Sequence, residues 1–318
     1  MRVGPDLARW LGDRERRAAS RRRLAGFAAH WAEATPLAAL ARALDALAAP
    51  DATAVSALVR PLLEAPGWAC DLIDRLIGEV RRDPFFEPPL TPVASGIESG
   101  LQLYAGRHAA IAIGVGALDR LAARKRAGGG EGAIAFTGHM MMLRAIKAGG
   151  ARLSLWEGGW RGDAILPVCR PVGDHELADG ELLAVDGRTT SFLVEHARSD
   201  MVMLHATILA ESAPTSCEYD GATRALIATG AASDGASRTQ LLTSLLGALG
   251  RGDADAFGAA SRAAEPFVRW HALREWLSVD MDAAAGRLHE MAAADPDAEL
   301  RGLAGRTLAL IEARRCRA

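Results

Sequence analysis

The sequence predicts an α+β protein in which a central antiparallel β-barrel or sandwich lies between two helical segments. Near residue 92, a pattern of helical period gives way to short alternating runs, and near residue 234 the helical period returns. Between these points, Gly, Pro and Asp turn signals separate the alternating runs. We therefore expect an N-terminal helical segment over 1–91, a β domain over 92–233 and a C-terminal helical segment over 234–318.

The N-terminal segment carries apolar residues at helical spacing. The first such run is Leu37, Leu40, Leu44 and Leu47. A second helix is expected after Asp51, a favourable N-cap residue, and a third over 70–80. Helical structure should stop within 83–89, because prolines lack a backbone donor and restrict the residue before them.

The middle of the chain reads as short strands between turns. An apolar stretch over 101–115 comes first and contains alternating β-branched residues. Further strands are expected over 133–136, 139–146, 151–156, 181–185, 189–196, 201–210 and 225–229. Many short strands at this spacing favour a sandwich or small barrel over a parallel sheet.

The C-terminal segment predicts consecutive short helices, the last beginning around Asp295-Pro296-Asp297 with N-cap chemistry. Its apolar pattern, with Leu273, Leu277, Leu288 and Met291 before the stretch 295–308, resembles a HEAT-type helical hairpin. That resemblance implies a packing or partner-binding surface and no chemistry of its own.

Composition excludes several classes of protein. The 318 residues are 50% hydrophobic and carry a net charge of −2, which is typical of a folded protein without a general attraction to nucleic acid or membrane. The four cysteines, none in a CxxC pair, argue against a zinc ribbon or disulfide framework. No apolar run reaches the ~20 residues of a membrane helix, and no secretory leader is visible. We expect a cytoplasmic protein.

A cluster of arginines near the N-terminus is the one basic feature of note. It comprises Arg14, Arg16, Arg17, Arg21, Arg22 and Arg23. Acidic residues are interspersed among them, which favours the solvated face of a helix over a nucleic-acid site.

Residues 173–187 carry a glycine-turn pattern. Gly173-Asp174-His175-Glu176-Leu177 is followed by Asp179-Gly180-Glu181-Leu182-Leu183 and Val185-Asp186-Gly187. This segment resembles the turn that joins two barrel strands in the cupin superfamily, and the resemblance implies a cupin-like barrel. Metal-binding cupins carry a His-x-His motif. This sequence has none, so their metal site cannot be carried over to it.

Histidines and methionines of the β domain are the candidate ligand-binding residues. If 197–200 is a hairpin loop, Phe192, Met203 and His205 share one face, while His196 and His205 stand ~13 Å apart, too far to bind one metal. His139 and Met141 share a face of their own strand, and Trp156 and Trp160 could rim a ligand mouth or pack inside. The candidate set is His139, Met141, Trp156, Trp160, Phe192, Met203 and His205.

These observations favour a non-enzymatic module that binds a small ligand or a protein partner and needs no cofactor. The alternative is a metal-dependent enzyme of the oxygenase or isomerase class, holding one Fe, Cu, Zn or Mn ion. Its ligands would come from His139, His175, Glu195, His196 and His205. No catalytic residue can be assigned, because the nucleophile-elbow, zinc-protease and dinucleotide motifs are all missing.

Overall fold

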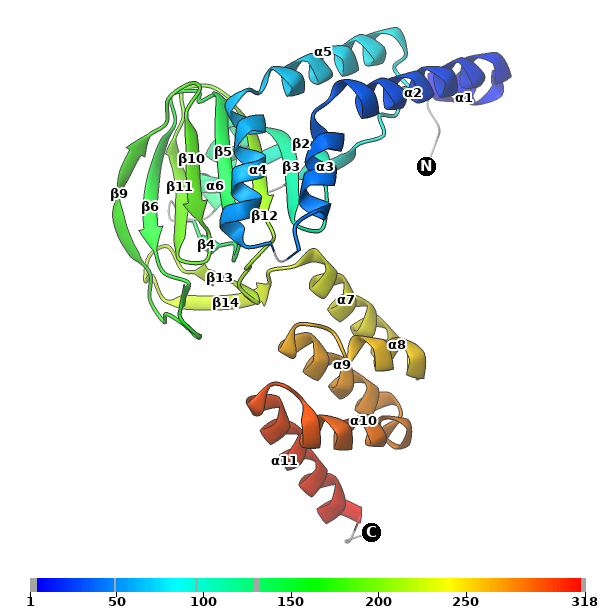
Figure 1. Ribbon diagram of the computed structural model, residues 1–318, viewed down its shortest axis with the longest axis vertical. Coiled ribbons are helices and arrows are strands. Elements are labelled where there is room, and N and C mark those ends of the chain that lie inside the picture. Colours follow the sequence, from blue (N-terminus) through cyan, green and yellow to red (C-terminus); the bar gives the residue numbers. More distant parts are fainter. Residues whose placement is uncertain (1–4, 49, 95–96, 128–131, 316–318) are drawn as a thin grey trace. The chain divides into compact units, whose positions relative to one another are not determined.

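The computed structural model describes residues 5–48, 50–94, 97–127 and 132–315. Over these residues the chain is a mixed α+β protein built from helices and antiparallel sheets, as the sequence predicts (Figure 1). It divides into two compact units, Met1–Thr229 and Gly230–Ala318. The first unit contains both the N-terminal helices and the β-sheets, so the change of pattern near residue 92 lies inside one compact unit.

Five helices open the first unit. They are α1 (Pro5–Gly12), α2 (Arg14–Ala34), α3 (Leu37–Asp45), α4 (Ala52–Glu64) and α5 (Gly67–Arg82). Asp51 caps α4 as expected, because its carboxylate accepts a hydrogen bond from the Ala54 amide. α5 ends at Arg82, with Asp83 as its C-cap immediately before Pro84, where the sequence predicted that helical structure would stop.

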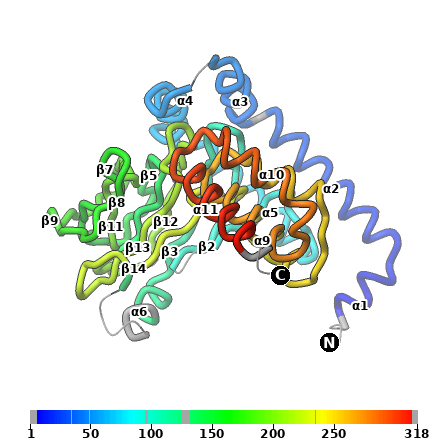
Figure 2. The backbone as a smooth tube through the Cα atoms, turned by 90° about the horizontal axis from the view of Figure 1, so that it is seen from below, coloured from blue at the N-terminus to red at the C-terminus, as the bar shows by residue number. Residues whose placement is uncertain are grey.

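A six-stranded antiparallel sheet is the centre of the first unit. Its strands, in spatial order, are β1 (Thr91–Ala94), β2 (Glu98–Ala105), β3 (Ala109–Gly116), β12 (Met201–Ile208), β5 (Met140–Lys147) and β10 (Leu182–Asp186). The apolar stretch 101–115 is thus two paired strands joined by a turn. α3 and α4 cover one face of this sheet, and Figure 2 shows α6 (Leu118–Ala127) on the other side of the strands.

Shorter sheets complete the first unit. One contains β11 (Thr190–His196), β6 (Arg152–Glu157) and β9 (Arg170–Glu176). Another contains β14 (Leu226–Ala231), β13 (Thr215–Tyr219) and β4 (Ile134–Phe136), and the last pairs β7 (Trp160–Arg161) with β8 (Ala164–Ile165).

The hairpin considered for β11 and β12 does not form. β11 pairs with β6, and β12 pairs with β3 and β5, so the two strands lie in different sheets. The connecting residues Arg198 and Ser199 donate their backbone amides to the Gly149 carbonyl. These bonds, together with a bulge between Val194 and His196, carry the chain from one sheet to the other.

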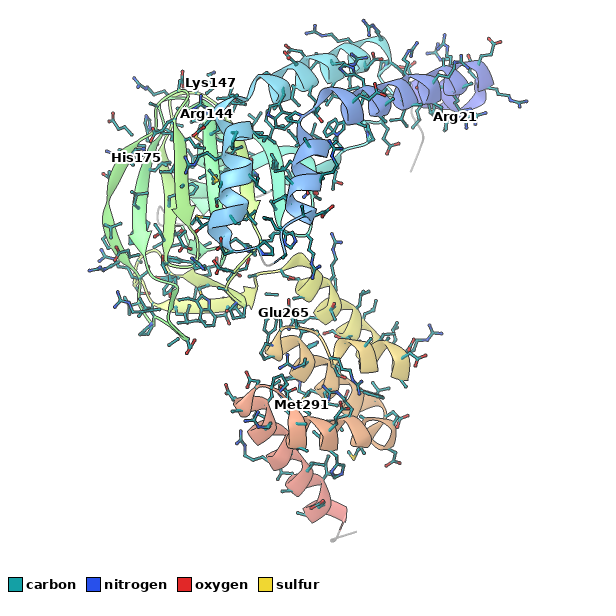
Figure 3. The ribbon with its side chains drawn as sticks, in the orientation of Figure 1. Arg21, Arg144, Lys147, His175, Glu265 and Met291 are labelled. Atoms are coloured by element: carbon teal, nitrogen blue, oxygen red, sulfur yellow. The ribbon has the colours of Figure 1, made fainter. Side chains whose placement is uncertain are left out.

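The second unit consists of helices α7 (Asp234–Ala248), α8 (Ala254–Ala260), α9 (Pro266–Val279), α10 (Met281–Ala294) and α11 (Ala298–Arg315). Met291, labelled in Figure 3, belongs to its apolar core with Leu273 and Leu288. Asp297 accepts hydrogen bonds from the first amides of α11, whereas Asp295 forms a buried ion pair with Arg269. Burial alone would raise the pKa of Asp295, but hydrogen bonds from Arg269 and the Asp297 amide outweigh it and lower this pKa.

No helix within the described ranges is both long enough and apolar enough to cross a membrane.

Candidate functional site

The central strand β3 presents only small side chains on one of its faces. Ile111 and Ile113 belong to the core formed with the N-terminal helices. Because side chains alternate along a strand, the intervening residues point to the opposite face of the sheet. These residues are Ala110, Ala112, Gly114 and Gly116. On the face turned away from α3 and α4, β3 therefore forms a strip of alanine and glycine that has no bulky side chain.

Larger residues of the two neighbouring strands border this strip. Ala112 of β3 is paired with Gln102 of β2 on one side and with His205 of β12 on the other. Glu98 lies on the same face of β2, four residues before Gln102, and is paired with Gly116. Its side chain crosses over Gly114, where a Cβ atom would stand only 2.0 Å from Glu98 Oε1. The absence of a side chain at Gly114 is what allows Glu98 to reach towards β12.

Glu98 and His205 meet above the strip. Nδ1 of His205 lies 3.4 Å from Oε1 of Glu98, and their side chains are 22% and 25% exposed. Oε1 itself is buried and accepts no hydrogen bond from the part of the chain that the structure describes. The His205 ring nitrogen approaches this oxygen without forming a hydrogen bond, and a buried carboxylate oxygen is more stable with a well-placed donor, since buried polar atoms normally have hydrogen-bond partners. This atom therefore marks a place where an external donor would be stabilised.

Residues of the other sheet lie over the same region. Val194 of β11 packs in one hydrophobic cluster with Met203 and Met201 of β12. Phe192 shares the Val194 side of β11, because no bulge separates them. Met141 of β5 lies opposite Thr207, which places it on the His205 face. The structure thus sets Met141, Phe192, Met203 and His205 on the surfaces between the two sheets.

The remaining ligand candidates lie elsewhere. The ring of His139 is buried, and its Nδ1 lies 2.7 Å from the Ser212 hydroxyl. Trp156 and Trp160 pack in a separate cluster with Phe136 and Tyr219. The Trp160 indole donates to the Thr215 carbonyl, and the Trp156 indole to the Ser154 hydroxyl. Both tryptophans therefore hold this second cluster together.

The five metal-ligand candidates do not converge. His175 lies on the edge strand β9 (Figure 3). Its Nε2 is 2.7 Å from Oε1 of Glu181, and Oε2 of Glu181 accepts a hydrogen bond from the Ala178 amide. Glu195 accepts a hydrogen bond from Ser154. Within the described ranges, no three His, Cys, Asp or Glu side chains are grouped so that they could hold a metal ion.

Buried thiols contribute no reactive group. Cys169 and Cys217 lie in the same cluster as Phe136, and burial raises the pKa of both thiols. A raised pKa keeps a thiol protonated and unreactive at neutral pH.

Glu98 is the residue that reasoning from the sequence missed. It precedes the apolar stretch that starts at Leu101, and its partner His205 is more than a hundred residues away. The alternation of small residues from Ala110 to Gly116 was visible and could have indicated a strip on one face of a strand. Nothing local indicated which residue would cross that strip.

Comparisons with known proteins give a limited result. No family model matches the chain, and no curated protein matches it. Ectoine synthase from P. lautus is 14% identical over 38% of this chain and 71% of its own, with a TM-score of 0.21. A cupin 2 conserved barrel domain protein from Rhodopseudomonas palustris is 12% identical over 41% and 79%, with a TM-score of 0.23.

The capsular polysaccharide assembling protein CapF from Staphylococcus aureus is 10% identical over 46% of this chain and 35% of its own, with a TM-score of 0.23. The structural neighbours thus include cupin-type barrels. TM-scores this low carry no argument from these proteins to the present chain. The class supported directly is a mixed α+β protein with antiparallel sheets.

Proposed function

We propose that the first unit binds a small ligand over β3, between the two sheets, and acts as a binding module without catalysing a reaction. The observation that carries this proposal is the buried Oε1 of Glu98, which accepts no hydrogen bond from the described residues and has the His205 ring 3.4 Å away from it, above a strip of alanine and glycine. Binding sites typically combine apolar walls with a few placed polar groups. Met203 and Val194 provide such walls, and Glu98 with His205 provides the polar pair.

The chemistry of Glu98 selects the class of ligand. An ionised carboxylate only accepts hydrogen bonds, so the complementary group is an N–H or O–H donor, and a cationic amine or amidine suits it best. We therefore propose a small amphipathic molecule with an amine or amidine head and a short apolar body. Apolar contact with Met203 would stabilise the body, because methionine adapts to irregular shapes.

Titration calorimetry with a panel of alkylamines and benzamidine tests this function. We expect saturable binding to the native protein and a loss of at least about tenfold in affinity in Glu98→Gln, which removes a charge-assisted hydrogen bond. Glu218→Gln is the matched control, because Glu218 is exposed on β13 and the substitution changes the charge equally. Equal weakening by the two substitutions, or no saturable binding, would reject the proposal.

The second candidate function is a metal-dependent enzyme of the oxygenase or isomerase class. The Glu98–His205 pair favours it, since a carboxylate and an imidazole within 3.4 Å are both ligands for Zn, Mn or Fe. Elemental analysis of protein purified without a metal-binding tag separates the two functions. About one equivalent of metal, lost in both Glu98→Gln and His205→Gln, would support the enzyme and displace the binding module.

We propose that the first unit is a cupin-like barrel, which the glycine-turn residues 173–187 and the facing antiparallel sheets support. A HEAT-like docking role for the C-terminal helices and a cytoplasmic location stay predictions.

A further inference from the structure

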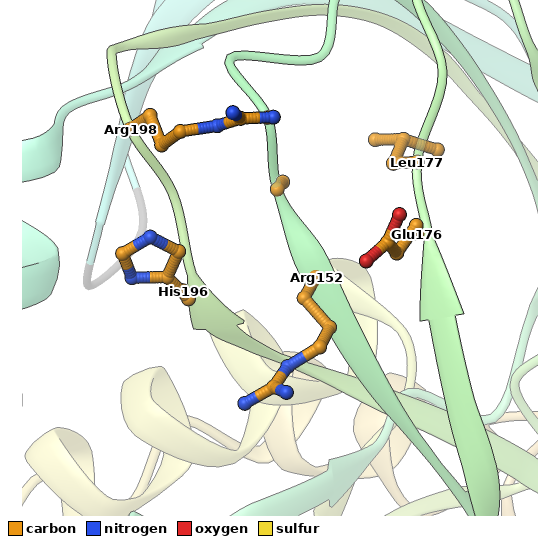
Figure 4. Close-up of a pocket in the computed structure, with 7 residues that line it drawn as sticks. Arg152, Glu176, Leu177, His196 and Arg198 are labelled. Atoms are coloured by element: carbon orange, nitrogen blue, oxygen red, sulfur yellow. The ribbon is translucent and has the colours of Figure 1, made fainter.

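A second concave site lies at one end of the sheet formed by β11, β6 and β9. It is an open pocket of about 450 Å³, and its lining residues are Gly150, Ala151, Arg152, Glu176, Leu177, His196 and Arg198. Figure 4 shows His196 and Arg198 on one side, Glu176 and Leu177 on the other, and Arg152 on the strand between them. The lining is rich in cationic groups, unlike the strip over β3.

Strand register brings three of these side chains together. Arg152 of β6 is paired with Glu176 of β9 on one side and with His196 of β11 on the other. The bulge between Val194 and His196 is what places His196 opposite Arg152. Directly paired residues in antiparallel strands project from the same face, about 5 Å apart. The pairing therefore fixes an arginine, a glutamate and a histidine side by side.

A glycine turn positions the second arginine. Gly149 and Gly150 both have φ of +65°, a conformation that glycine adopts without steric cost. The side chain of Arg198 lies directly over Gly150, where a Cβ atom would stand 2.4 Å from Nε. The backbone amide of Arg198 is held by the Gly149 carbonyl at 2.8 Å. The turn thus fixes the backbone of Arg198 and leaves space over Gly150 for its side chain.

Both arginines are exposed to solvent, and the carboxylate next to Arg152 in the strand register is that of Glu176. Neither Arg152 nor Arg198 makes a side-chain hydrogen bond or an ion pair with any described residue, although each guanidinium offers five donors. A pocket of about 430 Å³ near the N-terminus is also lined by arginines, but those arginines are paired with carboxylates. These pairs are Arg9–Asp6, Arg16–Asp13, Arg23–Asp83 and Arg82–Glu79.

We propose that the pocket between Arg152 and Arg198 binds a small oxyanion, carried by a carboxylate or a phosphate group. The planar guanidinium matches both groups through paired, charge-assisted hydrogen bonds. Glu176 limits the number of negative charges that the pocket accepts and favours a ligand with a donor on that side. This site differs in charge and in residues from the one over β3, so neither depends on the other.

Calorimetric titration of the full chain with citrate and, separately, with inorganic phosphate tests the proposal at constant ionic strength. We expect saturable binding of at least one anion, weakened about tenfold or more by Arg152→Gln and by Arg198→Gln, because each loses charge-assisted bonds. Binding of citrate alone would identify a carboxylate ligand, and binding of phosphate alone a phosphate ligand. Arg9→Gln, which removes the same charge from the N-terminal pocket, should leave the affinity unchanged.

Two further variants sharpen the test. Gly150→Ala keeps every charge but forces Arg198 away, so it should weaken binding as much as Arg198→Gln while a melting curve confirms folding. Glu98→Gln should leave oxyanion binding intact. The proposal is overturned if neither anion binds saturably, or if Arg9→Gln weakens binding as much as Arg198→Gln, since binding would then follow net charge alone.

Discussion

The two faces of the six-stranded sheet differ in what they bury. The helix-covered face is mainly apolar, with Ile111, Leu204 and Ile208 fully buried against Val55 and Val59 of α4, although Arg144 of β5 also lies on it, opposite Leu204. The opposite face has small residues along β3 and carries the polar pair of Glu98 and His205.

Under the proposed function, one face of the sheet provides stability and the other provides binding. Burying apolar area stabilises a fold by roughly 25 cal/mol per Å², and the helix-covered face buries such area in one large cluster of apolar side chains. Alanine and glycine on the other face bury little area, and the space above the glycines is taken by the side chains of Glu98 and Met201. The residues that stabilise the fold and those that form the candidate site lie on different faces and can therefore be substituted separately.

The largest effect is expected on the helix-covered face. Leu204→Ala removes a side chain that is 0% exposed and should lower the free energy of unfolding by about 2–5 kcal/mol. Met203→Ala, its neighbour on the other face, is only half-buried and should cost less. Denaturant titration compares the two variants. A larger loss of unfolding free energy in Met203→Ala than in Leu204→Ala would contradict the conclusion that the helix-covered face contributes more to stability.

Two glycines on the candidate-site face should respond differently to alanine. At Gly100 a Cβ would stand 2.2 Å from the Ile113 carbonyl oxygen, which belongs to the neighbouring backbone, so we expect a loss of about 1–3 kcal/mol. At Gly114 the Cβ meets only the end of the Glu98 side chain, which can move. Gly114→Ala should therefore cost less than Gly100→Ala in thermal unfolding, yet abolish amine binding. Retained binding in Gly114→Ala would show that the position of Glu98 is not needed.

Glu98→Gln should not destabilise the protein. The substitution preserves shape and removes a charge whose Oε1 lacks a hydrogen bond from the described residues, so the free energy of unfolding should stay equal or rise by up to about 1 kcal/mol. Chemical denaturation at neutral pH measures this. A decrease of more than about 1 kcal/mol in the free energy of unfolding would mean that Glu98 stabilises the fold. The candidate-site face would then contribute to stability as the helix-covered face does.

The smallest effect is expected for the pH dependence of stability that comes from Asp186 on the edge strand β10. Asp186 ends β10 and faces Met140, on the side covered by helices. A hydrogen bond from the Arg188 side chain lowers the pKa of Asp186. Its contribution to stability is therefore complete at neutral pH and is lost as the pH falls below about 4.

The native protein should lose stability between about pH 5 and pH 3, and Asp186→Asn should lose less over the same range. The difference should be below about 1 kcal/mol, because the Asp186–Arg188 pair is partly exposed. Thermal unfolding over this pH range gives the difference. Asp174→Asn, exposed on β9, serves as the control. An equal change in the two variants would show that the acid response belongs to the overall charge.

Much of the local structure could be predicted from the sequence alone. The α+β class, the cap at Asp51, the helix end before Pro84 and the run of antiparallel strands follow from side-chain periodicity and from the backbone limits of proline and glycine. These are short-range effects, since each depends on residues within a few positions of one another.

Only the tertiary structure decided which strands pair and which side chains meet. The connection at 197–200 could have closed a hairpin, but hydrogen bonds to Gly149 direct it from one sheet to the other. The Glu98–His205 pair and the pocket of Arg152 and Arg198 both depend on register between distant strands. Register is set by packing over the whole sheet, and a shift of one residue would turn each of these side chains to the opposite face.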